Sequence, residues 1–113
     1  MSEASVVRPL SAPSLAGWLA DASREKPFLL DVREPWEFET CHLDDASLIP
    51  MRDIPMRVDD IDLDVPIVCI CHHGARSMQV AAFLASRGAT DVHNLTGGLA
   101  AWSRLVDPAF PTY

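Results

Sequence analysis

Residues 66–88 read PIVCICHHGARSMQVAAFLASRG and carry the pattern that decides the fold. The segment 66–71, PIVCIC, is a continuous apolar run with β-branched side chains, which predicts a buried strand. The segment 76–88, RSMQVAAFLASRG, predicts a helix whose wide apolar arc is largely covered, with Gly88 at its C-terminal cap. Between them lies the polar loop CHHGARS (71–77). Ligands in parallel α/β folds bind beyond the carboxyl ends of the strands, so this loop is the first candidate for a functional site.

The alternation of strand and helix continues on both sides of this segment. Short apolar runs predict further strands at 28–32, 46–50 and 92–95. Capping residues, prolines and helical spacing predict helices at 11–22, 35–40, 51–58 (interrupted by Pro55) and 98–106. This order predicts an α/β fold with a mainly parallel sheet and helices on both faces. We expect the three tryptophans in the core or at its rim: Trp18, Trp36 and Trp102.

The composition is that of a globular protein without a nucleic-acid or membrane partner. The 113 residues form one expected domain (1–113), and 49% of them are apolar. Nine Lys and Arg against sixteen Asp and Glu give a net charge of −7, which disfavours phosphate backbones and anionic membranes. No apolar run reaches the roughly 20 residues of a membrane helix. The start, MSEASVVRPLSAP, lacks the pattern of an export signal, so we expect a cytoplasmic location.

Cys71 is the candidate nucleophile. It ends the predicted strand and is followed by a loop whose backbone N–H groups can converge on one point. The N-terminus of the next helix, Arg76, and protonated His72 or His73 add positive charge, which favours a thiolate. Gly74 allows the loop to curl. We therefore expect a nucleophilic cysteine at position 71.

The other cysteines and histidines have simpler explanations. An odd number of cysteines, with no export signal, favours free thiols in a reducing compartment. Cys69 lies inside the strand and is expected to be buried and inert. Zinc-ligand residue types crowd into positions 69–73, but ligands this close cannot readily close a tetrahedron, and His42 and His93 stand alone. We expect no metal.

The chain resembles the rhodanese-like sulfurtransferases. The resemblance is carried by CHHGARS, the apolar helix after it and NLTGGLAAW (94–102), and further by FLLDVREPWEFE (28–39) with His42, Ala46, Ile49 and Pro50. It extends from about residue 8 to about residue 106. It implies a stand-alone, single rhodanese-like domain with a five-stranded parallel sheet between helices.

The same resemblance implies a reaction and a site. A loop from Cys71 to Arg76 would cradle a persulfide on the catalytic Cys71. The donor would be thiosulfate or a small-molecule or protein persulfide, and the acceptor a thiol or, in an assay, cyanide. No cofactor is implied. The expected donor-binding residues, with Arg76 holding an anionic donor, are His72, His73, Gly74, Ala75, Arg76 and Ser77.

Several residues have expected structural roles, and two positions depart from the family pattern. Asp31 and Arg33 are expected to support the fold through an ion pair or loop hydrogen bonds. His42 is expected to make a structural hydrogen bond, and Gly97 and Gly98 to form a tight turn. Cys41 stands where the family usually has glycine, and Asp44 and Asp45 where it usually has Pro-Gly, and both changes remove residues that favour turns.

Two rival functions remain. A phosphatase or arsenate reductase on the same fold also uses a Cys…Arg loop, but with five intervening residues to hold a tetrahedral oxyanion. Four residues separate Cys71 from Arg76, which favours a single sulfur atom. A non-catalytic rhodanese-like binding module is the second rival, and the presence of both Cys71 and Arg76 argues against it.

Overall fold

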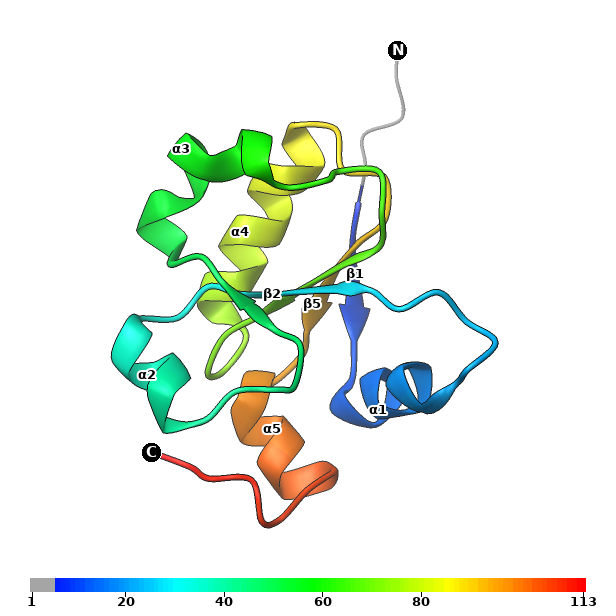
Figure 1. Cartoon of the computed structure of the whole chain (residues 1–113), viewed down its shortest axis with the longest axis vertical. Coiled ribbons are helices and arrows are strands. Elements are labelled where there is room, and N and C mark those ends of the chain that lie inside the picture. The colour runs from blue at the N-terminus through cyan, green and yellow to red at the C-terminus, as the bar shows by residue number, and fades with distance from the viewer. Residues whose placement is uncertain (1–5) are drawn as a thin grey trace.

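The predicted sheet is present, with the strand that precedes the loop at its centre. The computed structural model describes residues 6–113; the expectation of no export signal rests partly on residues 1–5, which lie outside this range. All strand pairs are parallel, in the order β1-β5-β4-β2-β3. The strands are β1 (Val7–Leu10), β2 (Phe28–Asp31), β3 (Ser47–Leu48), β4 (Ile67–Ile70) and β5 (Val92–Leu95) (Figure 1). The expected five-stranded α/β architecture is confirmed.

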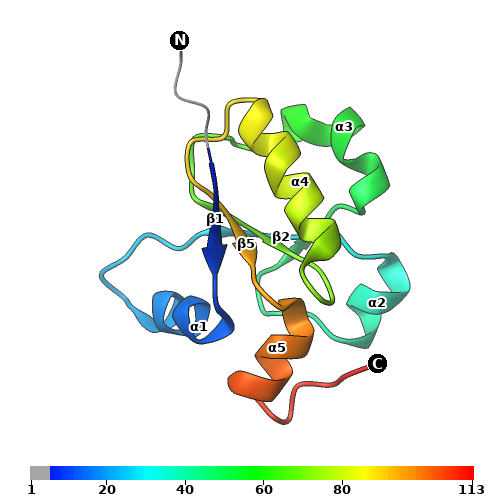
Figure 2. The same cartoon turned by 180° about the vertical axis from the view of Figure 1, so that it is seen from behind.

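Helices cover both faces of the sheet, as Figures 1 and 2 show from opposite sides. They are α1 (Ala12–Ala20), α2 (Pro35–Thr40), α3 (Ile54–Arg57), α4 (Ala75–Ser86) and α5 (Gly98–Leu105), with 3₁₀ turns η1 (Met51–Asp53) and η2 (Val58–Asp60) around α3. Core side chains of α3 and α4 pack on one face. Those of α1 and α5 pack on the other.

The strand β4 is buried on both sides, which explains its continuous apolar sequence. Ile67 and Cys69 face the core beneath α4, whereas Val68 and Ile70 face the core beneath α1 and α5. All four are 0% exposed. Burying an aliphatic side chain stabilises a fold by about 1.5–3 kcal/mol, so this strand anchors the residue that follows it, Cys71.

Four sequence expectations need correction. Trp36 is 59% exposed, because α2 is a single short helix that turns this side chain to solvent. Pro55 does not interrupt the third helix but lies in its first turn, where proline needs no N–H partner. The helix α1 ends at Ala20, two residues early. The helix α4 is not largely covered, since Met78 is 44% exposed.

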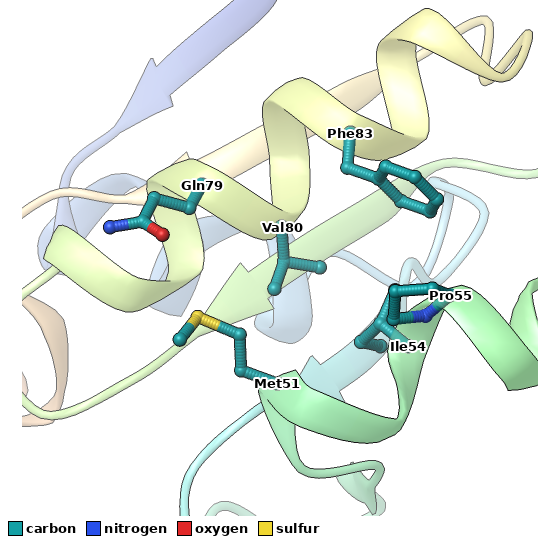
Figure 3. A pocket seen from close by; sticks show the side chains of 6 residues that line it. All are labelled: Met51, Ile54, Pro55, Gln79, Val80 and Phe83. Carbon is teal, nitrogen blue, oxygen red and sulfur yellow. The ribbon is translucent and has the colours of Figure 1, made fainter.

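A small hollow between α3 and α4 is lined by no residue of the loop 71–77. Figure 3 shows its six lining side chains, three from η1 and α3 and three from α4: Met51, Ile54, Pro55, Gln79, Val80 and Phe83. Within residues 6–113, no helix combines the length and apolar composition needed to cross a bilayer.

Candidate functional site

The loop after β4 wraps around the sulfur of Cys71. The Gly74 and Ser77 backbone N–H groups both donate to Cys71 Sγ, at 3.0 and 3.3 Å. The Ser77 hydroxyl oxygen lies 3.2 Å from the same sulfur. Gly74 has a φ of +104°, a conformation that favours glycine and that turns its N–H inward. The donors therefore converge on one atom at the start of α4, as the sequence predicted, and this arrangement stabilises negative charge on sulfur.

Cys71 lies at the bottom of this loop. Cys71 is only 1% exposed, so a sulfur donor must reach its sulfur atom through the mouth of the loop. The thiol is free, as are those of Cys41 and Cys69. Cys69 is fully buried, and burial raises the pKa of its thiol to about 12. The two cysteines of this strand segment thus differ in the expected way: one is enclosed by core, the other by hydrogen-bond donors.

The end of β5 and the start of α5 hold the loop from behind. Asn94 donates through Nδ2 to the Gly74 carbonyl at 3.2 Å, and its Oδ1 lies 2.5 Å from the Ser77 hydroxyl. That hydroxyl has one proton, so it serves Asn94 or the Cys71 sulfur at a given moment. The N–H groups of Leu99 and Ala100 donate to the carbonyls of Cys71 and His72, each at 3.0 Å. Sequence analysis did not single out Asn94, although it lies in the quoted NLTGGLAAW segment.

Arg76 is paired with a carboxylate from α2. Its guanidinium donates to both oxygens of Glu37, at 2.7 and 2.9 Å. Glu37 is 4% exposed and also accepts the Glu34 backbone N–H at 2.9 Å. The Arg76 hydrogen bonds outweigh burial and lower the pKa of Glu37 to about 2, while the pKa of Arg76 is raised. The positive charge of Arg76 is therefore already balanced by Glu37 before any sulfur donor binds.

The expected ion pair of Asp31 and Arg33 lies next to this pair, at the end of β2. Both residues are 0% exposed, and Arg33 donates to both Asp31 oxygens, with the shortest contact at 2.7 Å. Its remaining N–H groups reach the carbonyls of Glu37 and Cys41, at 3.2 and 2.6 Å. A buried pair with further partners ties α2 to the sheet, and this is the structural role expected from the sequence.

Tyr113 joins the two ion pairs. Its hydroxyl donates to Glu37 at 2.7 Å and accepts from Arg33 at 3.0 Å. Burial is the largest cause that raises its pKa to about 12, so the hydroxyl keeps its proton near neutral pH. The residue lies beyond the segment 8–106 that carried the resemblance, and sequence analysis missed it.

The two loop histidines differ in exposure. His73 is exposed and His72 is half-buried, with their ring centroids 4.1 Å apart. Burial, and then the neighbouring His73, lower the pKa of His72 below its usual value, so it is neutral near neutral pH. His72 therefore adds less positive charge to the loop than a protonated imidazole would.

The segment 41–45, which departs from the family pattern, still forms a turn and hydrogen bonds to its neighbours. Asp45 adopts a φ of +66°, the left-handed region in which glycine is common and aspartate tolerated. Cys41 is 7% exposed, and its carbonyl receives the Arg33 hydrogen bond. His42 contacts the Phe38 carbonyl at 2.8 Å and stacks on the Phe38 ring, which confirms its structural hydrogen bond.

Glu37→Gln is expected to remove part of the protein's sensitivity to acid. The pKa of Glu37 is lowered from 4.5 to about 2, so its ionised form stabilises the fold above about pH 4.5. That contribution, on the order of 3 kcal/mol, is lost as the pH falls towards 2. Urea unfolding measured along this range should show the wild type losing its advantage over Glu37→Gln at low pH. Parallel stability curves for the two proteins would contradict the role given to this carboxylate.

Comparison with known proteins gives one consistent result. Residues 15–105 match the rhodanese-like domain family. A protein named sulfurtransferase from Allochromatium vinosum is 39% identical over 99 residues, which cover 88% of this chain and 91% of that protein. The thiosulfate sulfurtransferase GlpE of Pseudomonas syringae pv. syringae is 38% identical, over 74% of this chain and 79% of its own.

The solved structures agree with the sequence relatives. The crystal structure of a rhodanese-like domain protein from Staphylococcus aureus superposes with a TM-score of 0.80 at 25% identity, covering 95% of this chain and 99% of its own. With a five-stranded parallel sheet, a cysteine loop at its carboxyl edge and these relatives, the chain belongs to the rhodanese-like domain family.

Proposed function

We propose that the protein is a sulfurtransferase that carries a sulfane sulfur on Cys71. The observation that carries the proposal is the convergence of the Gly74 and Ser77 N–H groups on Cys71 Sγ, at 3.0 and 3.3 Å. Donors fixed around a sulfur atom stabilise the anion before and after it takes up a second sulfur, without reorganisation. Relatives named sulfurtransferase support the same activity.

The proposed reaction has two steps. The Cys71 thiolate attacks the outer sulfur of thiosulfate or of a persulfide, and the electron pair of the broken S–S bond leaves with sulfite or a thiolate. Cys71 then carries a persulfide anion. An acceptor thiolate, or cyanide in an assay, attacks the outer sulfur and restores the Cys71 thiolate. The steps exchange one S–S bond for another bond to sulfur and need no cofactor or outside oxidant.

The remaining loop residues bind and orient the donor. The Gly74 and Ser77 amides contact the sulfur, and the partly exposed His72 and the exposed His73 follow Cys71 in the same loop. Arg76 presents the N–H groups that Glu37 leaves unused to an anionic donor. Because Glu37 balances its charge, this attraction is weaker than a lone guanidinium would give. Organic persulfides, which carry one negative charge on the persulfide group against two on thiosulfate, therefore lose little as donors. Three free thiols also fit a reducing compartment such as the cytoplasm.

Intact mass spectrometry tests the carrier role. The purified protein is incubated with thiosulfate or an organic persulfide, and its mass is compared before and after a reductant. We expect a gain of one sulfur atom, mapped to Cys71 and removed by the reductant or by cyanide. A chain that gains no sulfur from either class of donor, while its thiol remains alkylatable, would refute the proposal.

The spacing of the loop makes a second prediction, on phosphate chemistry. Four residues between Cys71 and Arg76 leave less room than the five that hold a tetrahedral oxyanion in phosphatases on this fold. We expect aryl-phosphate hydrolysis to stay at the background rate under conditions that give sulfur transfer. Hydrolysis above background that disappears in Cys71→Ser would instead favour the phosphatase function.

A further inference from the structure

Tyr113 lies outside the residues that match the family, yet it contacts residues of the candidate site. The match ends at residue 105, whereas the chain continues past α5 and returns towards α2 (Figures 1 and 2). There the Tyr113 hydroxyl donates to Glu37 Oε2 at 2.7 Å and accepts an N–H from Arg33 at 3.0 Å. One phenol thus bridges a fully buried ion pair and the ion pair that holds the loop arginine.

The ring of Tyr113 also touches the loop itself. Its centroid lies 4.3 Å from the His72 ring and 5.3 Å from the Trp36 ring. Trp36 is 59% exposed and Tyr113 is 40% exposed, so both stand at the surface beside the loop. The exposure of Trp36 contradicted the sequence expectation, and its contact with Tyr113 gives it a place in the rim of the site.

The hydrogen bonds around Glu37 show how the hydroxyl acts on Arg76. Oε1 accepts from the Glu34 N–H and from Arg76, and Oε2 accepts from Arg76 and from Tyr113. With both oxygens doubly occupied, the carboxylate has one orientation, and a bidentate partner must follow it. Without the phenol, Oε2 keeps only Arg76, and the carboxylate loses one of the four hydrogen bonds that restrict its rotation about the last side-chain bond.

We propose that Tyr113 is a positioning residue for donor binding, which acts through Glu37 on Arg76. The inference rests on the proposed sulfurtransferase function for its kinetic readout. The hydroxyl fixes the Glu37 carboxylate, the carboxylate fixes the guanidinium, and the guanidinium presents its free N–H groups at the mouth of the loop. The ring supports the same loop from the side, through His72.

Tyr113→Phe separates the hydroxyl from the ring. We expect this variant to raise the thiosulfate KM about five- to tenfold, which corresponds to about 1 kcal/mol, the scale of one hydrogen bond from a side chain that is itself 40% exposed. The rate at which cyanide discharges preformed Cys71 persulfide should remain that of the wild type. Tm should fall by only a few degrees, because the hydroxyl also accepts from Arg33. Tyr113→Ala should raise KM further, because it also removes the ring from His72. Thr112→Ala, an exposed neighbour, is the matched control and should match the wild type.

A double-mutant cycle tests the route through Glu37. In a Glu37→Gln background, Tyr113→Phe should have no further effect on KM, because its target carboxylate is gone. An unchanged KM in Tyr113→Phe, or the same fold-change in both backgrounds, would overturn the proposal. If partial unfolding of the variant, shown by its lowered Tm, explains the whole rise in KM, the proposal is also overturned.

Alkylation of Cys71 keeps this test independent of the proposed activity. Iodoacetate is an anion and iodoacetamide is neutral, so the ratio of their rates at Cys71 reports the positive charge that Arg76 presents. We expect Tyr113→Phe to lower the ratio of the iodoacetate rate to the iodoacetamide rate. Both rates are measured by mass spectrometry of the peptide that contains Cys71. An unchanged ratio overturns the positioning role even if sulfur transfer is confirmed. A lowered ratio in a protein that transfers no sulfur refutes the proposed function and supports the positioning role.

Discussion

Cys71→Ser is expected to abolish sulfur transfer from thiosulfate to cyanide, with a loss of at least about a thousandfold, the scale of removing a covalent nucleophile. A serine hydroxyl is a poor nucleophile near neutral pH and cannot carry a persulfide. The smaller oxygen can still accept the Gly74 and Ser77 N–H groups, so the loop should keep its shape. Steady-state assays and circular dichroism on the same preparation measure activity and fold together.

The other two cysteines provide the controls. Cys69→Ala and Cys41→Ala should retain most of the activity, because one side chain is enclosed in the core and the other contacts Arg33. Alanine avoids placing a new hydroxyl in the core at position 69. Substantial turnover by Cys71→Ser would refute the assignment of the nucleophile. A complete loss in a folded Cys41→Ala protein would instead assign the reactive thiol to Cys41, directly after α2.

The central part of the fold follows from the sequence, because both faces of the sheet are covered. A strand buried on both sides must be apolar throughout, so 66–71 was recognisable without its partners, and β4 was predicted within one or two residues of its bounds. The edge strand β1 (Val7–Leu10) was not among the strands predicted from the apolar pattern. It contains Arg8 and Pro9, both exposed, and proline is tolerated in an edge strand where its missing N–H has no partner.

The candidate site was predictable only where it is contiguous in the chain. The loop 71–77 supplies the sulfur and the donors that surround it, so a short motif reveals most of that geometry. Glu37 and Tyr113 lie 39 and 37 residues from Arg76, and only the folded chain brings them together. Sequence analysis therefore identified Arg76 as the loop cation without the carboxylate that balances it.

Gly98→Ala is expected to cause the largest loss of stability among the substitutions considered, together with a loss of activity. Gly98 has a φ of +62°, and a Cβ there would overlap the backbone of the loop, 2.5 Å from the Cys71 carbonyl oxygen and closer still to that of His72. These carbonyls accept the N–H groups of Leu99 and Ala100 in the first turn of α5. The left-handed backbone costs a non-glycine residue about 1–2 kcal/mol, and overpacking adds about 1–3 kcal/mol. A total of about 2–5 kcal/mol should lower Tm by roughly 10–30 °C in a chain of this size.

Substitutions at two other glycines distinguish the cost of a left-handed backbone from the effect of a clash with the loop. Gly88 has a φ of +107° but open space around the position of a Cβ, so Gly88→Ala should show the backbone cost alone and keep its activity. Gly17 lies inside α1 with open space and an ordinary φ, so Gly17→Ala should stabilise the protein by about 0.5–1 kcal/mol. Thermal unfolding compares the stability of the three variants. Sulfur-transfer assays, run well below each Tm, compare their activity. Because the Gly98 overlap pushes on the carbonyls of Cys71 and His72, only Gly98→Ala should lose specific activity while folded. Equal activity losses in Gly88→Ala and Gly98→Ala would show that the approach of α5 does not set the geometry of the loop.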